Sequence, residues 1–103
     1  MTYKPNSYHK NNAKDLGVKI TPSKAKGKKL QVELPDKKIK QIGAKGYMDY
    51  QLYKQKEGNE VANMKREAYR SRHRCHNAER YSAQHLACEI LWGNRKKGIL
   101  RGK

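Results

Sequence analysis

Alternating apolar and polar positions near the middle of the chain predict a β-hairpin. Leu30, Val32 and Leu34 fall on one side of a strand, with polar residues between them. Residues 35–38 have turn chemistry, because proline presets one backbone dihedral and aspartate can accept hydrogen bonds from nearby amides. Residues 39–42 then return as a second strand. Since a lone hairpin is marginal in water, this one must pack on helices or extend the sheet of a partner.

Helical spacing follows the hairpin. Asp49 can cap a short helix running from Tyr50 to about Lys56. A longer helix is predicted from Glu60 to about His76 and another from Arg80 to about Leu91, although one continuous helix across Asn77 is an alternative. The predicted buried stripe of the long helix comprises Val61, Met64, Ala68, Tyr69, Ser71 and Cys75.

Two further residues complete the prediction for the helical half. Trp92 is expected to be the largest single contributor to the core. Gly93 is expected to stop the last helix.

The two ends of the chain are rich in lysine and arginine and poor in apolar residues. Residues 1–29 contain eight lysines and one acid, Asp15, and are predicted to form an extended basic arm with one short strand-like piece. Residues 93–103 contain five cations and no acid, and are predicted to form a basic tail. The predicted fold is therefore α+β: a small hairpin and two or three short helices over residues 30–92, between extended basic arms.

Composition narrows the class of protein. The chain has 103 residues, of which 35% are hydrophobic and none is Phe, so one small domain with a thin core is expected. Its net charge of +16 is self-repelling, and an anionic partner would relieve that repulsion.

No apolar run is long enough to span a membrane, and the first residues lack the apolar core of a signal peptide. With only two cysteines, an intracellular and reducing location is predicted.

The candidate contacts for such a partner are cations and tyrosines in the middle of the chain. Cations bind phosphates or acidic protein surfaces, while tyrosines stack on exposed bases or anchor an interface. Two glycines flank Lys45 and could present backbone amides to an anion, but a hinge is the preferred interpretation. The predicted contact residues are Lys45, Lys65, Arg66, Arg70, Arg72, Arg74, Arg80, Tyr47 and Tyr50.

Metal binding and catalysis are considered and not predicted. His73, His76, His85 and Cys88 could form a mixed zinc site, because His73 and His76 are three residues apart on a helix, as are His85 and Cys88. However, no C-x-x-C pair is present, and the surroundings are basic. Cys75 lacks an evident activating base and a pocket, so both cysteines are interpreted as small core residues. The chain is predicted to be non-enzymatic, with no cofactor and no small-molecule substrate.

The stretch from Ile42 to Tyr50, IGAKGYMDY, resembles a family of short basic proteins of uncharacterised function encoded by large DNA viruses and some phages. The resemblance extends over residues 30–92 through Lys54–Glu57, Tyr69–His73 and the closing Leu91-Trp92. It implies a viral origin and a role in the virion, with no catalytic residues to carry over.

Two functions are compatible with these features. The first is a minor capsid or cement-type protein of a virion, which binds larger acidic subunits and resides in the virion or in the host cell interior. The alternative is a nucleic-acid-binding protein that packages viral DNA or belongs to an RNA assembly such as a ribosome. The resemblance favours the first, and charge favours the second.

Overall fold

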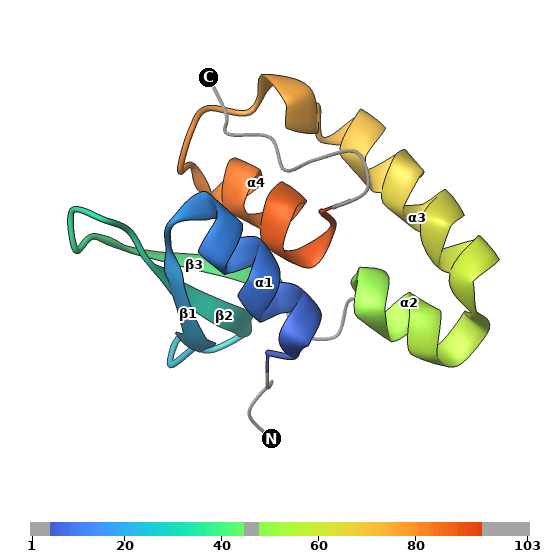
Figure 1. The fold of residues 1–103 in the computed structure, drawn as a ribbon, viewed down its shortest axis with the longest axis horizontal. Helices are drawn as coiled ribbons and strands as arrows, with labels where there is room; N and C mark the ends of the chain where they lie inside the picture. Colours follow the sequence, from blue (N-terminus) through green and yellow to red (C-terminus); the bar gives the residue numbers. More distant parts are fainter. Residues whose placement is uncertain (1–4, 45–47, 94–103) are drawn as a thin grey trace.

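The predicted hairpin is the centre of the fold. The computed structural model describes residues 5–44 and 48–93, and in it β2 (Lys28–Glu33) pairs antiparallel with β3 (Ile39–Ala44). The turn between them is held as expected, with the Lys38 amide donating to the Asp36 carboxylate over 3.0 Å. A third strand, β1 (Lys19–Pro22), lies on the other side of β2, giving the order β1-β2-β3 (Figure 1). The α+β class is confirmed.

Residues 7–16 form helix α1 (Ser7–Leu16), so the prediction of an extended arm over residues 1–29 is wrong for this part of the chain. The side chain of Asn6 accepts from the His9 amide, and the His9 side chain accepts from the Asn6 amide, which closes a capping box. Gly17 ends the helix in the left-handed conformation. Its buried positions have helical spacing, but two of the four are polar: His9, Asn12, Ala13 and Leu16.

Helices α2 (Tyr50–Glu57) and α3 (Asn59–Arg72) pack against each other as a hairpin at one side of the molecule (Figure 1). Asp49 caps α2 as predicted, accepting from the Leu52 amide over 3.1 Å. The predicted buried stripe of the long helix is correct for Tyr69 and Cys75 but wrong for Met64, which is 68% exposed, and for Ala68 and Ser71, which are also exposed. Ala62 and Arg66 are buried instead, so α3 is rotated relative to the prediction.

The C-terminal part is broken near Asn77, in agreement with the prediction of two separate helices and not with the alternative of one continuous helix. After α3 come a short 3-10 turn, η1 (Cys75–Asn77), and helix α4 (Ala83–Leu86), which continues into a π-helix, η2 (Ala87–Leu91).

Side chains from other elements satisfy the carbonyl groups near the end of the π-helix. Asn12 donates to the Ile90 carbonyl over 3.2 Å, and Tyr8 donates to the Gly93 carbonyl. Helix α1 is thereby fixed to the end of η2.

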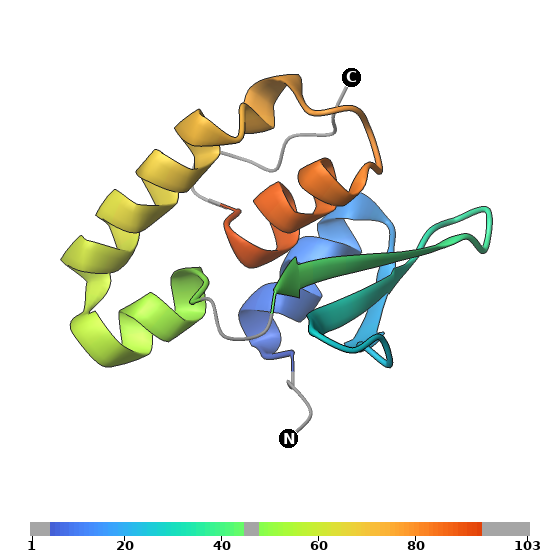
Figure 2. The same cartoon turned by 180° about the vertical axis from the view of Figure 1, so that it is seen from behind.

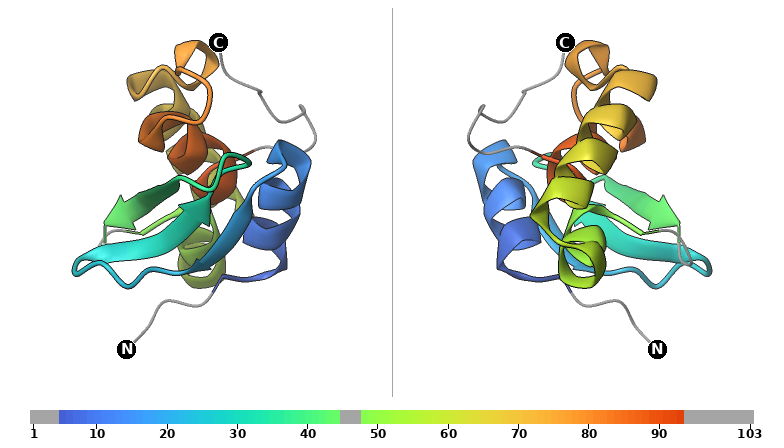
Figure 3. Two further views of the ribbon diagram at one scale, coloured as in Figure 1. Left: turned by 90° about the vertical axis from the view of Figure 1, so that its left-hand side faces the viewer. Right: turned by 90° about the vertical axis from the view of Figure 1, so that its right-hand side faces the viewer.

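The core lies between one face of the sheet and the helices packed over it. In Figure 3, α1 and the α4–η2 segment lie on the same side of the three strands. Trp92 is buried in this cluster, as predicted. Its most deeply buried large aliphatic members are Leu16, Leu30, Val32, Ile42, Leu86 and Ile90. No helix in the described ranges is long and apolar enough to cross a bilayer.

Candidate functional site

The most distinctive surface feature is a half-open hollow of about 620 Å³. It lies where the end of β3 meets the α2–α3 hairpin and η2, and these elements can be followed in Figure 2. Helix α3 forms one wall, with lining positions three or four residues apart on a single helical face, from Lys65 to His73. Leu91 and Trp92 at the end of η2 form the facing wall.

Aromatic rings form the walls of this hollow. The Tyr69 ring stacks on Trp92 with centroids 4.5 Å apart and planes 10° apart. Tyr69 also contacts His73, one helical turn further on, with ring centroids 4.1 Å apart. Tyr53 of α2 approaches Trp92 at 6.1 Å. Since Tyr53 and Tyr69 are half-buried and His73 is exposed, each of these three side chains keeps some solvent-accessible surface at the hollow.

Cations form its rim. Lys65 and Arg72 are exposed and line the hollow from α3, one turn before and about one turn after Tyr69. The Lys65 ammonium lies 5.6 Å from the centre of the Tyr53 ring, within the range of a cation–π contact. Burial raises the pKa of Tyr69 while the nearby Arg72 opposes that rise, so its phenol stays neutral and keeps an uncharged stacking surface.

A buried ion pair closes the floor. The Lys29 ammonium lies 3.4 Å from a carboxylate oxygen of Asp49, and the two side chains are only 5% and 1% exposed. The His9 ring approaches the same oxygen at 3.9 Å. Burial lowers the pKa of His9, although the Asp49 carboxylate opposes this. Asp49 therefore has two structural roles: it caps α2 and neutralises Lys29 beneath the hollow.

The structure separates the predicted contact residues into surface and interior groups. Lys65 and Arg72 lie at the hollow, and Arg74 and Arg80 are exposed elsewhere. Lys45 and Tyr47 lie outside the described residues.

Arg66, Arg70 and Tyr50, in contrast, are not surface contacts. The Arg66 guanidinium lies 4.1 Å from the centre of the Tyr50 ring and donates to the Asn63 side chain. Arg70 forms an ion pair with the fully buried Glu89. These cations point inward because the chain has few large apolar side chains to fill the gap between α3 and η2. Their long aliphatic stems fill that gap, and their heads reach buried acceptors.

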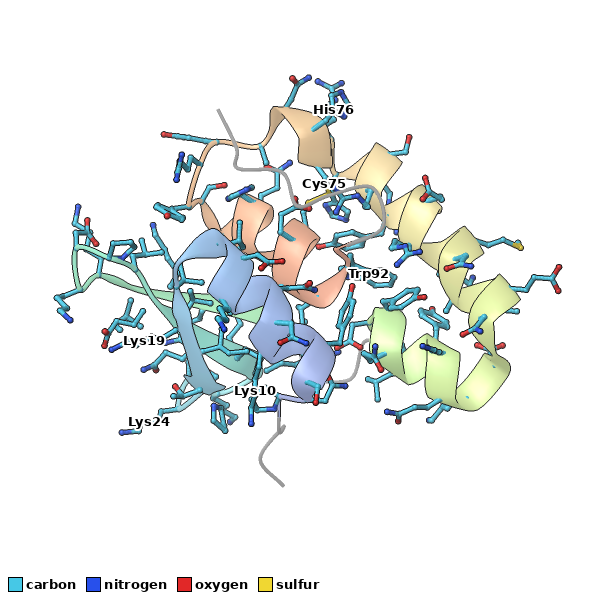
Figure 4. The ribbon with its side chains drawn as sticks, in the orientation of Figure 1. Lys10, Lys19, Lys24, Cys75, His76 and Trp92 are labelled. Atoms are coloured by element: carbon cyan, nitrogen blue, oxygen red, sulfur yellow. A yellow bond between two sulfur atoms is a disulfide. The ribbon has the colours of Figure 1, made fainter. Side chains whose placement is uncertain are left out.

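Cys75 and Cys88 form a disulfide, which the sequence did not predict. Both are buried, so their assignment to the interior is correct, but Cys88 has no free thiolate to bind zinc. His85 is buried and its ring accepts from the Tyr81 amide, whereas His76 points outward at the far end of α3 (Figure 4). No cluster of metal-binding side chains is found among residues 5–44 and 48–93.

Several residues of the hollow were missing from the predicted contacts: Lys29, Tyr53, Tyr69 and Trp92. Tyr69 and Trp92 were assigned to the core. The four-residue spacing of Lys65, Tyr69 and His73 was a usable signal, because it places a cation and two rings on one face.

One family model, described as a family of unknown function (DUF5754), matches residues 18–60. No curated protein and no solved structure matches the chain. The matched segment covers the sheet and α2, and therefore the floor of the hollow and Tyr53. The chain is thus similar to that family over the sheet and α2, while most of α3 and all of η2, which form the two facing walls, lie beyond the match.

Proposed function

We propose that the protein binds nucleic acid and that unpaired bases enter the hollow. The observation that carries this proposal is the combination of accessible aromatic rings and a cationic rim in one recess. Bases stack on aromatic side chains irrespective of sequence, while lysine and arginine neutralise the backbone phosphates. A hollow of about 620 Å³ also falls in the size range of small-ligand sites.

The recess favours single strands over duplexes. In a duplex the bases are stacked and paired, so their faces cannot reach rings that lie behind Lys65 and Arg72. The virion role stays a prediction that rests on the resemblance, as do the viral origin and the absence of enzymatic activity. Nucleic-acid binding is compatible with a position inside a particle.

The test uses the fluorescence of Trp92, the only tryptophan in the chain, as a reporter of the hollow. A single-stranded oligonucleotide should quench it, with an affinity that falls steeply between about 50 and 200 mM salt. Lys65→Gln with Arg72→Gln should lower the salt slope by about 1.4, since each phosphate contact on a single strand contributes ~0.7.

A matched control removes two charges outside the hollow. Lys54 and Lys56 are exposed on the adjacent helix α2 and do not line the recess. Lys54→Gln with Lys56→Gln should leave the affinity within about twofold of the parent, because surface charges without a direct phosphate contact contribute little. The proposed site would be refuted if both double variants lost the same amount of affinity for the oligonucleotide, or if the parent chain did not bind it.

A further inference from the structure

A second cationic surface lies on the part of the molecule formed by α1, β1 and the turn leading into β2. All of its lysines are exposed. Lys10 and Lys14 are one helical turn apart on α1, and α1 packs beside β1, which carries Lys19. Figure 4 shows Lys10, Lys19 and Lys24 on this side, away from Trp92. The members of this lysine face are Lys10, Lys14, Lys19, Lys24 and Lys26.

The elements that carry the lysine face and the strand end that borders the hollow lie on opposite sides of the protein. Helix α1 and β1 lie toward the viewer in Figure 1, whereas the end of β3 that borders the hollow lies toward the viewer in Figure 2. These two views look along the shortest axis of the molecule, which is 22 Å long. The core occupies the space between them, so one strand seated in the hollow leaves the lysine face open to another.

The chemistry of the lysine face differs from that of the hollow. Asp15 is the sole acidic side chain from residue 5 to residue 28, and Glu33 of β2 pairs with Lys19 across the sheet, so the face carries an excess of positive charge. Tyr8, the aromatic residue of that stretch, is half-buried against Tyr50 and donates its hydroxyl hydrogen to the Gly93 carbonyl. The lysine face therefore offers positive charge without a ring for stacking, which suits phosphate groups and not bases.

We propose that the lysine face is a second nucleic-acid contact, which binds the phosphate backbone of another strand. One molecule then bridges two strands, one held by its bases in the hollow and the other by its phosphates. This inference rests on the proposed function, because bridging requires that the hollow bind the first strand.

The experiment measures capture of one strand by another. A biotinylated oligothymidylate on beads is mixed with the full-length protein and a fluorescent oligothymidylate at about 50 mM salt, where phosphate contacts are strong. The test variant is Lys10→Gln, Lys19→Gln and Lys24→Gln, and Trp92 quenching is measured on the same samples. The matched control is Lys37→Gln, Lys38→Gln and Lys40→Gln at the β2–β3 turn, where Lys37 and Lys38 already pair with acids.

The parent chain and the control should capture the fluorescent strand, and the test variant should lose most of that capture while keeping its Trp92 quenching. Quenching without capture by the parent chain would overturn bridging and leave the proposed function intact. Equal capture by the test variant would show that protein self-association joins the strands, and it would also overturn the inference. If polyglutamate, and not the second strand, binds the lysine face, the partner is an acidic protein and bridging is overturned. If no oligonucleotide quenched the fluorescence of Trp92, the proposed function itself would be refuted.

Discussion

Polar side chains occupy core positions that small domains usually fill with aliphatic ones. His9 and Asn12 are fully buried on α1, and each is hydrogen-bonded to backbone or side-chain groups of its surroundings. Arg70 reaches across from α3 to Glu89 and to the Cys88 carbonyl. A buried polar group is tolerated when it is hydrogen-bonded, and its hydrogen bonds form only when the surrounding helices are arranged in one way. These residues therefore specify how the helices dock as well as filling space.

Glycine at position 43 is a further requirement at the residue scale. Its φ of +75° is left-handed, and a Cβ there would lie 2.9 Å from Leu91 and 3.2 Å from the Lys29 side chain. Gly27 has a similar φ of +80° but nothing within 4 Å of a Cβ. Gly27→Ala should lower the free energy of unfolding by about 1 kcal/mol, because alanine is strained at this φ. Gly43→Ala should lower it by about 1–3 kcal/mol more, because the added methyl group overpacks the interior. Urea unfolding of the two variants measures the difference, and equal costs would contradict the close approach of the Leu91 side chain to residue 43.

At the scale of elements, the position of α3 depends on side chains more than on close helix packing. Three links join it to the C-terminal helix: the Tyr69–Trp92 stack, the Arg70–Glu89 ion pair and the disulfide that follows its end. The same links connect the two walls of the hollow. Binding in the hollow is therefore coupled to the integrity of these connections.

The disulfide provides a test of how far one of these links stabilises the fold. It closes a loop between residues 13 apart in sequence, so its reduction by dithiothreitol should cost about 3 kcal/mol of stability. For a domain of this size the melting temperature should fall by roughly 10–20 °C. Cys75→Ala with Cys88→Ala should melt at a similarly low temperature and should be insensitive to dithiothreitol. Two titratable thiols in the untreated native protein would contradict the pairing.

On the scale of the whole molecule, most lysines of the N-terminal half lie apart from the core. The exposed lysines of the N-terminal half lie on the outside of α1, β1 and the turns, while apolar residues from both halves of the chain share one core. Helix α1 is part of that core through Leu16, through the Asn12–Ile90 bond and through the Tyr81 hydroxyl, which donates to the Leu16 carbonyl. Residues 7–22 are therefore needed for the fold, in contrast to a dispensable arm.

Truncation shows whether the N-terminal segment is part of the fold or a dispensable arm. Deletion of residues 1–17 should abolish the cooperative thermal transition, because it removes a helix that covers the core. A chain lacking residues 1–4 keeps the Asn6 cap and should melt like the parent. As an intermediate case, Leu16→Ala should cost about 2–5 kcal/mol, the usual range for a buried leucine. Circular dichroism during heating measures the transition. If the chain that lacks residues 1–17 still unfolds cooperatively, the N-terminal segment is a dispensable arm after all.

The sequence by itself determined the elements whose signals are local. Alternation and turn chemistry located β2 and β3, and the Asp49 cap located α2, since period-two spacing and capping act within a few residues. Tertiary structure alone decided the features that depend on contacts distant in the chain: the docking of α1, the rotation of α3, the disulfide and the hollow. The residues next to them in the sequence give no sign that His9, Asn12 and Arg70 are buried. They become interior residues because their partners lie up to 78 positions away.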